Sequence, residues 1–240
     1  MRAVHRISRV CLLWVLLALT PLVSHATDFD RLTVISYHEI EEPSRALIPG
    51  YAVSPTMFVR HIDWLRNNGF VFVSVDQVLS AKSGGALLPP KAVLLTFDDG
   101  YTSVYQHAWP LLKMLKIPSV ISVVTRWQES AGHVDYDGKQ VPREQFLSWE
   151  ALREMQSSGL VEIASHTHDL HHGLQANPQG SAQPAATARR FDRVRGYEAE
   201  TDYLKRIDSD LRLSRDLIRK RIGTAPRIVT WPYGKYNEMV

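Results

Sequence analysis

Six short apolar runs, separated by stretches of helical character, constrain the fold of this 240-residue chain more than any other feature. The runs are Leu32–Tyr37, Phe70–Val75, Ala92–Phe97, Ser119–Val124, Leu160–Ser165 and Arg227–Trp231. Short and continuous apolar runs are typical of strands that are buried on both faces, and parallel sheets bury their strands in this way. The sequence therefore predicts an α/β fold in which parallel strands alternate with helices.

Helix signals occupy the intervals between these runs. Ser54 and Pro55 supply an N-cap and a first-turn proline, and Gly69 stands where that helix should end. Further helices are predicted over residues 76–82, 102–116, 148–159 and 199–221, and Pro110 is expected to interrupt or kink the second of these. Residues 174–190 have the composition of a loop.

The first 26 residues have the features of a secretory signal peptide. Three arginines precede the apolar run Val10–Leu19, which is too short to span a bilayer, and Ser24-His25-Ala26 offers a cleavage site. We therefore expect residues 27–240 to be the mature domain, and we expect it to be periplasmic or secreted. Because the chain stops soon after the sixth apolar run, the domain is also expected to be truncated at its C-terminus.

Removal of the signal changes the charge balance of the chain. The full sequence has 28 basic and 25 acidic residues, and the first 26 residues carry three arginines and no acid, which leaves 25 of each. A formal charge of zero gives no support for nucleic-acid binding. The single cysteine, Cys11, lies in the expected signal and is not preceded by a lipobox, so no lipid anchor is expected.

Chemically active side chains follow the ends of four predicted strands. They are His38, the pair Asp98 and Asp99, His166, and the Trp231-Pro232-Tyr233 segment. In barrels and open α/β sheets the carboxyl ends of the strands form the active site. These four positions therefore predict one shared site rather than four unrelated features.

The residue types at this edge indicate a metal-dependent hydrolase. Two adjacent carboxylates after a buried strand are costly to desolvate and repel each other, and a bound cation would offset that cost. One carboxylate and two imidazoles, with the imidazoles supplied by the run Ser165–His172, suit zinc, cobalt, nickel or iron and leave positions open for water and substrate. A second carboxylate can take a proton from water, and a further histidine can protonate the leaving group. The alternatives are a plain Asp-Asp-Gly turn and a solvated histidine-rich loop.

The motif Thr96-Phe97-Asp98-Asp99-Gly100 resembles the signature of the polysaccharide deacetylases, the NodB-homology group or carbohydrate esterase family four. The resemblance covers essentially all of residues 27–240 and implies a distorted (β/α)7-type barrel of parallel strands. It also implies that Asp98 is the catalytic base and that Asp99 is a metal ligand.

A second motif narrows the resemblance. His166-Thr167-x-x-x-His171 is one residue longer than the usual family motif and resembles the exported poly-β-1,6-N-acetylglucosamine N-deacetylases of bacterial biofilm systems. This implies that His166 and His171 are the other metal ligands. Tyr37-His38 resembles the circularly permuted members, which implies that His38 is the catalytic acid, and residues 175–185 resemble their long insertion.

The last motif departs from the family pattern. Trp231-Pro232-Tyr233-Gly234 stands where the family usually has Arg-x-Pro-Tyr-Gly, so the group that orients Asp98 is left open and modest turnover is expected. Tyr101, Trp231 and Tyr233 are expected to contact the substrate.

The resemblance implies metal-dependent removal of N-acetyl groups from poly-β-1,6-N-acetyl-D-glucosamine during export of biofilm exopolysaccharide. A contact with an outer-membrane export pore is expected with it. Two alternatives stay open: deacetylation of another polymer, such as peptidoglycan, chitin or acetylxylan, and a truncated glycan-binding remnant without turnover.

Overall fold

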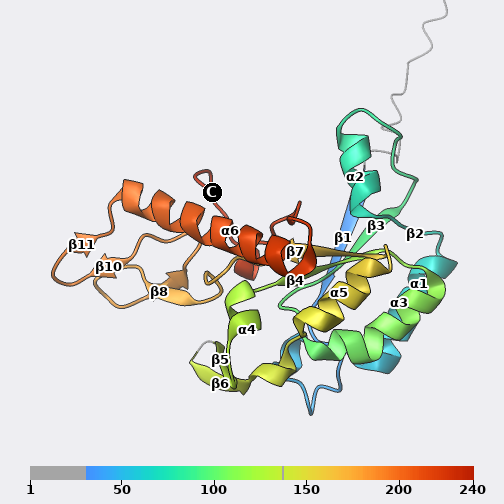
Figure 1. Cartoon of the computed structure of the whole chain (residues 1–240), viewed down its shortest axis with the longest axis horizontal. Helices are drawn as coiled ribbons and strands as arrows, with labels where there is room; N and C mark the ends of the chain where they lie inside the picture. Colours follow the sequence, from blue (N-terminus) through green and yellow to red (C-terminus); the bar gives the residue numbers. More distant parts are fainter. Residues whose placement is uncertain (1–30, 137) are drawn as a thin grey trace, which may run out of the picture.

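The computed structural model describes residues 31–136 and 138–240, and the expected signal peptide lies outside this part of the chain. A parallel sheet forms the centre of the molecule (Figure 1). Its strands are β1 (Leu32–Tyr37), β2 (Val71–Phe72), β3 (Ala92–Phe97), β4 (Ser119–Val123) and β7 (Val161–Ser165). The order is β1-β3-β4-β7, and β2 pairs with the first two residues of β3. The predicted α/β fold with parallel strands is therefore confirmed.

The register of the sheet brings the ends of its strands to one edge. Tyr37 at the end of β1 pairs with Phe97 at the end of β3, and Val123 at the end of β4 pairs with Ser165 at the end of β7. The residues that follow these strands therefore leave the sheet side by side.

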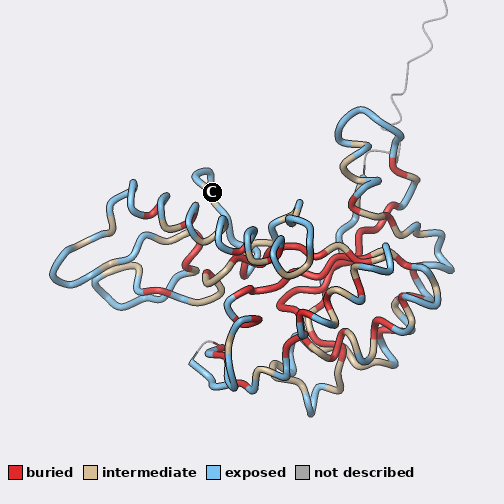
Figure 2. The backbone as a smooth tube through the Cα atoms, in the orientation of Figure 1, coloured by how far each residue is buried: buried red, intermediate tan, exposed pale blue. Residues whose placement is uncertain are grey.

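Helices surround the sheet and bury its apolar side chains. They are α1 (Pro55–Asn67), α2 (Val75–Lys82), α3 (Trp109–Leu115), α4 (Thr125–Glu129), α5 (Trp149–Ser157) and α6 (Glu200–Ile222). In Figure 1, α1, α3 and α5 gather on one side of the strands, and α6 runs past the edge strand β7, where its C-terminal part contacts α5. Figure 2 shows that the buried residues are concentrated in the strands and on the inward faces of these helices. Among the described residues, no helix is long and apolar enough to cross a bilayer.

Two predicted elements are shorter than the apolar pattern indicates. The run Phe70–Val75 forms only the two-residue strand β2, because Ser74 caps helix α2 through a capping box with Gln77. The run Arg227–Trp231 forms a single parallel bridge between Val229 and Ser165.

The predicted helix over residues 102–116 is interrupted near Pro110 as expected. The chain forms a π-helical turn at Val104–Ala108 before α3 begins. Proline has no N–H to donate, and its ring crowds the preceding turn of a helix. The wider π-helical turn before α3 makes room for the ring of Pro110, which then lies in the first turn of α3, where no N–H is needed.

Among the described residues, three hairpins and three short 3-10 helices add to the predicted elements. One hairpin joins β5 (His133–Tyr136) to β6 (Lys139–Pro142), and the expected loop contains a second, which joins β8 (Gly173–Gln175) to β9 (Ala182–Pro184). A third joins β10 (Phe191–Asp192) to β11 (Gly196–Tyr197). The remaining elements are the short 3-10 helices Pro49–Tyr51, Arg143–Gln145 and Pro232–Gly234.

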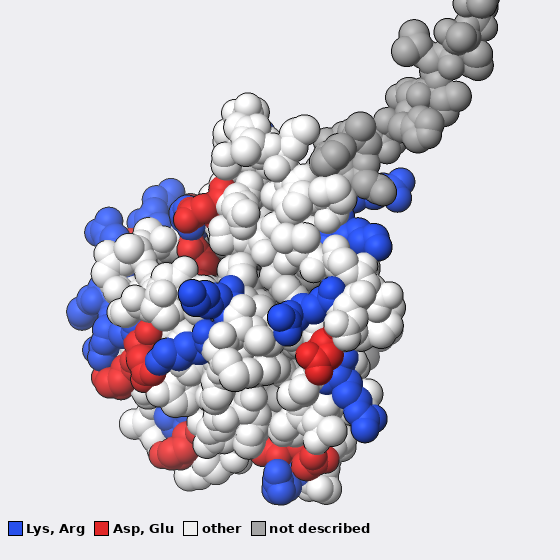
Figure 3. Space-filling model, turned by 90° about the vertical axis from the view of Figure 1, so that its right-hand side faces the viewer, with Lys and Arg blue, Asp and Glu red and all other residues white. Residues whose placement is uncertain are grey.

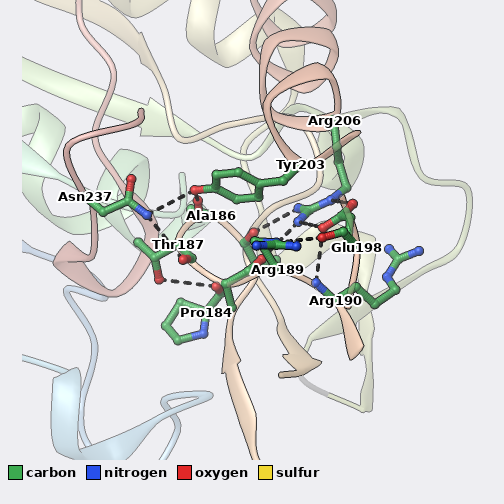
Figure 4. Close-up of polar contacts among 11 residues, drawn as sticks. Pro184, Ala186, Thr187, Arg189, Arg190, Glu198, Tyr203, Arg206 and Asn237 are labelled. Carbon is green, nitrogen blue, oxygen red and sulfur yellow. Dashed lines mark hydrogen bonds and ion pairs between the residues drawn. The ribbon is translucent and has the colours of Figure 1, made fainter. Parts of the chain in front are cut away.

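The segment that contains β8 to β11 is fastened to helix α6 (Figure 4). The Tyr203 hydroxyl donates to the carbonyl of Ala186 over 2.6 Å, and Arg206 forms an ion pair of 2.8 Å with Glu198. Arg206 also donates to the carbonyls of Ala185 and Ala188. These bonds attach the segment that contains β8 to β11 to helix α6.

Charges on the surface are mixed. On the face that Figure 3 presents, basic and acidic side chains alternate without a broad area of one sign. This pattern is typical of a solvated surface rather than of a polyanion-binding one.

Candidate metal centre and active site

A sharp turn after β3 sets the two aspartates in place. The amide of Asp98 still donates to the carbonyl of Tyr37 over 2.9 Å, which continues the β1–β3 pairing by one residue. Asp99 and Gly100 then take φ angles of 68° and 70°. A Cβ on Gly100 would lie 2.9 Å from Cγ1 of Val123, so both the conformation and the space require glycine there.

His166 leaves β7 next to these aspartates. Its amide donates to the carbonyl of Val123, and its Nδ1 lies 2.7 Å from the carbonyl oxygen of Thr230. Because a carbonyl only accepts, Nδ1 carries the proton and Nε2 is left as the donor atom for a metal. The Thr230 carbonyl is thus a functional group that sequence reasoning missed.

Asp99, His166 and His171 converge on one point. Their ligand atoms all lie within 4.8 Å of one another. Oδ1 of Asp99 lies 3.4 Å from Nε2 of His166 and 3.2 Å from Nε2 of His171, yet it is fully buried and receives no aligned hydrogen bond. The three ligand atoms face one another without a well-aligned hydrogen bond between them, which is how the ligands of a metal ion are arranged. A set of one carboxylate and two imidazoles suits zinc or a related ion.

The neighbouring histidines point elsewhere. Nδ1 of His168 lies 2.9 Å from the hydroxyl of Thr125, and Nδ1 of His172 lies 2.9 Å from the carbonyl of Gly173. The structure therefore separates His166 and His171 from the other histidines of the run.

The electrostatics of the cluster favour a cation. Burial alone would raise the pKa of Asp99, but the two imidazoles outweigh it and hold the pKa well below the ordinary value. Burial alone would lower the pKa of His166, and the Asp99 carboxylate outweighs it so that the pKa is raised. The buried carboxylate and the two imidazoles thus favour a positive charge at this point.

Asp98 lies beside the cluster in a different environment. Oδ2 accepts a hydrogen bond of 2.8 Å from the Ser36 hydroxyl on β1, while Oδ1 is buried without a hydrogen-bond partner among the described residues. The side chain of Ser36 therefore orients Asp98, the role left open by the missing arginine. The unpaired oxygen of Asp98 is available to accept a proton.

His38 reaches the same edge of the sheet through the strand register. It follows Tyr37, which pairs with Phe97, so His38 leaves β1 beside Asp98. Its ring stacks on Tyr51 at a centroid distance of 5.4 Å. The adjacent acid Glu39 does not pair with His38 and instead accepts a hydrogen bond of 3.2 Å from the amide of Ile48.

The three expected substrate contacts differ in their surroundings. The ring of Tyr233 is 41% exposed and lies 4.6 Å from that of His171, so it borders the cluster. Trp231 is half-buried and packs against an apolar cluster formed by helix α6 and the segment that contains β8 and β9. Tyr101 is only 2% exposed, and its hydroxyl donates to Tyr136, so its side chain is part of the core rather than a substrate contact.

Two further residues near the cluster were not predicted as site residues. The Tyr136 hydroxyl donates to Oδ2 of Asp99 over 3.3 Å, and the ring of Trp127 packs 5.0 Å from that of His171. Trp127 lies in helix α4 and Tyr136 in the β5–β6 hairpin, and the sequence pattern predicted neither element.

A polar cleft of about 610 Å³ opens next to His171. Helix α4, the β5–β6 hairpin and the turn after β7 form its walls. Its lining includes Arg126, His133, Asp135, Gln140, Asp169 and His172. Hydroxyl-rich ligands are bound by polar walls of this kind, so the cleft is a suitable site for a sugar chain.

The fold and the site together define an α/β protein with a candidate metal-dependent hydrolytic centre at the carboxyl ends of its parallel strands. Comparison with known families then identifies it more closely. The chain belongs to the polysaccharide deacetylase family, whose model matches residues 86–240.

Individual relatives agree with this assignment. The poly-β-1,6-N-acetyl-D-glucosamine N-deacetylase of Escherichia coli K12 is 37% identical over 212 residues, which are 87% of this chain and 31% of that protein. This chain therefore spans about a third of that relative. A solved de-N-acetylase from Aggregatibacter actinomycetemcomitans is 39% identical with a TM-score of 0.82, covering 88% of this chain and 82% of that one.

A second solved structure, the BpsB deacetylase domain of Bordetella bronchiseptica, is 39% identical with a TM-score of 0.77 and covers 87% of this chain and 82% of that one. The predicted resemblance to the deacetylase family and the predicted α/β fold of parallel strands are confirmed; of a (β/α)7-type barrel, the described residues form five paired strands and one further parallel bridge, between Val229 and Ser165.

Proposed function

We propose that this protein is a metal-dependent hydrolase that removes N-acetyl groups from poly-β-1,6-N-acetyl-D-glucosamine. The observation that carries the proposal is the convergence of Asp99, His166 and His171 on one point with Asp98 beside them. The names of relatives at 37% and 39% identity support the reaction type, and the E. coli relative supports the polymer.

Asp99, His166 and His171 would hold the metal, which we propose to be zinc, cobalt, nickel or iron. When bound, such an ion supplies a water of lowered pKa and polarises the acetyl carbonyl. The Thr230 carbonyl and the Tyr136 hydroxyl fix the orientation of His166 and Asp99 through hydrogen bonds.

Asp98 acts as the general base in this proposal. Its unpaired Oδ1 accepts the proton of the attacking water, while Ser36 holds Oδ2. His38 then delivers a proton to the amide nitrogen, because an amine anion is not a viable leaving group. The two groups follow paired strands at the same register, which places both at the edge of the sheet that carries the proposed metal ligands.

We further propose that the polymer lies in the cleft beside His171, with the reacting sugar at the metal end. The amino-terminal sequence supports a periplasmic or secreted location, with residues 1–26 as a cleavable signal and residues 27–240 as the deacetylase domain. In that compartment the protein would meet the polymer during export, and a contact with an outer-membrane export pore is part of this proposal.

Release of free amines from defined oligosaccharides tests the proposal. Purified protein is stripped of metal, reloaded with zinc, cobalt or nickel, and given β-1,6-linked N-acetylglucosamine oligomers, with β-1,4-linked N-acetylglucosamine oligomers and, followed by acetate release, acetylated xylan as alternative substrates. We expect metal-dependent amine release from the β-1,6 series in preference to the others. Preference for another polymer would replace the proposed substrate, and no turnover of any of them by metal-loaded protein would reject the enzymatic function.

A further inference from the structure

The turn between His166 and His171 has a demanding conformation. Four residues separate the two imidazoles, and both Nε2 atoms must face Oδ1 of Asp99. Thr167 takes a φ of 71°, which is unfavourable for a β-branched residue. The hydroxyl of Thr167 accepts a hydrogen bond from the amide of Leu170, which closes the turn. Such a turn persists only if surrounding groups hold it.

Helix α6 holds this turn from one side. Oδ1 of Asp210 accepts from the amide of His168, and Oδ2 accepts from the amide of Asp169, both over 2.7 Å. One helical turn later, the buried hydroxyl of Ser214 lies 2.7 Å from that of Ser165, which accepts from the amide of Thr167. Both oxygens of one carboxylate are thus committed to two successive amides of the turn.

Helix α4 holds the same turn from the other side. The amides of Thr125 and Arg126 donate to the carbonyls of Thr167 and His168 over 3.2 and 3.1 Å. Arg126 also forms an ion pair with Asp169. On this side the bonds come mainly from backbone amides, whereas on the α6 side they depend on the side chain of Asp210.

The geometry points to Asp210 as a positioning residue that sets the metal affinity of the site by fixing the turn that carries His171. This inference rests on the proposed metal centre, but not on the proposed polymer or reaction. Asp210 does not contact Asp99, His166 or His171 through any hydrogen bond or ion pair in the described residues. Asp210 holds the turn in its final conformation before the metal binds, so that no binding free energy is spent on ordering the turn.

The chemistry of the carboxylate makes Asp210→Asn a sharp test. Asparagine has nearly the same shape, but it offers one oxygen and one NH2 group where the turn presents two N–H donors. One amide therefore loses its acceptor and faces another donor. Asp208→Asn is the matched control, because Asp208 lies exposed on the same helix and, in the described part of the chain, forms hydrogen bonds and an ion pair with Arg212 alone.

Metal affinity is measured directly, without substrate. Metal-stripped protein is titrated with zinc against a chromophoric chelator, and the visible spectrum of the cobalt form reports the ligand geometry. We expect Asp210→Asn to weaken zinc binding about 10- to 100-fold and to alter the cobalt spectrum, as loss of an outer hydrogen-bond partner does at other metal sites. Asp208→Asn should match the wild type in both. At zinc concentrations above its weakened Kd, Asp210→Asn should regain metal and activity.

Equal zinc affinity and an unchanged cobalt spectrum in a folded Asp210→Asn protein would overturn the inference. If that variant does not fold, Asp210→Ser takes its place, since a serine side chain offers one oxygen where the carboxylate offers two. A folded Asp210→Ser protein with wild-type zinc affinity would then overturn the inference. Wild-type protein that binds metal but deacetylates nothing would reject the proposed function and leave this inference standing, whereas wild-type protein that binds none of zinc, cobalt, nickel and iron would overturn both.

Discussion

Asp98 and Asp99 are neighbours in the sequence, but their environments give them different roles. Asp99 is fully buried between two imidazoles, while Asp98 is held by a serine hydroxyl and keeps one oxygen unpaired. The sequence motif indicates that the pair is functional. The proposed split of roles depends on which oxygen faces which partner, and only the structure shows these partners.

Replacement of each aspartate by asparagine should separate these roles. Asp98→Asn should keep the metal and lose activity by about a hundred- to ten-thousand-fold, the usual contribution of a general base. Asp99→Asn should lose the metal itself. Metal analysis and amine release on the same samples check both expectations. If Asp98→Asn loses metal and Asp99→Asn keeps it, the two roles are exchanged.

His38 is tested by the choice of substrate. An amide needs a proton on its nitrogen before it leaves, whereas an activated ester has a stable leaving group and needs the proton far less. His38→Ala should therefore lose about a hundredfold or more on an N-acetyl substrate and much less on an activated acetyl ester, with unchanged metal content. Equal losses on both substrates would make His38 structural or assign the acid elsewhere.

At the scale of elements, the pairing of β1 with β3 positions Asp98, the proposed general base. Ser36 pairs with Thr96, and Asp98 follows two residues later, so both side chains lie on one face of the sheet and meet over 2.8 Å. Ser36→Ala should lower kcat about tenfold with little change in KM, since a hydrogen bond to a charged group contributes about 1.5 kcal/mol. Zinc affinity should not change. A wild-type kcat for this variant would mean that another group orients Asp98.

The elements differ in how far their sequences predict them. Strands β3, β4 and β7 are predictable because their neighbours cover both faces, which selects continuous apolar runs. The β5–β6 hairpin escaped prediction because its strands are short and mostly polar. The signal was nevertheless present: Val134 and Tyr136 alternate with exposed residues, and Asp137-Gly138 is a favoured hairpin turn.

The site was predictable to a similar extent. The motif residues follow strand ends, and the sheet register brings them together. Thr230, Tyr136 and Asp210 act through a backbone carbonyl or through side chains that are common in any protein, so no local pattern distinguishes them. Their positions beside the site depend on contacts between residues far apart in the sequence, and such contacts cannot be predicted from the local pattern of one sequence.

At the scale of the whole molecule, the paired charges predict a pH dependence for the metal-free protein. The pKa of Asp99 is lowered, so its contribution to stability is present above about pH 4 and is lost only as the pH falls through the lowered value. The pKa of His166 is raised, so its contribution is present below about pH 6.5 and is lost as the pH rises through the raised value. Metal-free protein should therefore be most stable between about pH 4 and 6.5.

Bound zinc should instead stabilise the protein more as the pH rises, because a histidine must release its proton before it can bind the metal. The rise in melting temperature caused by excess zinc should be larger at pH 8 than at pH 6. Thermal unfolding with and without zinc at the two pH values checks this. A zinc effect that shrinks as the pH rises would contradict the assignment of His166 as a ligand.

The central claim is that one metal ion, held by Asp99, His166 and His171, makes this domain a deacetylase. The most direct measurement is a stepwise zinc titration of metal-stripped protein, with amine release from a β-1,6-linked N-acetylglucosamine oligomer recorded at each step. We predict that the rate rises from near zero and reaches a plateau at one zinc per chain, and that His171→Ala shows no such rise. Full activity in the metal-stripped protein, or a rate independent of added metal, would contradict the account.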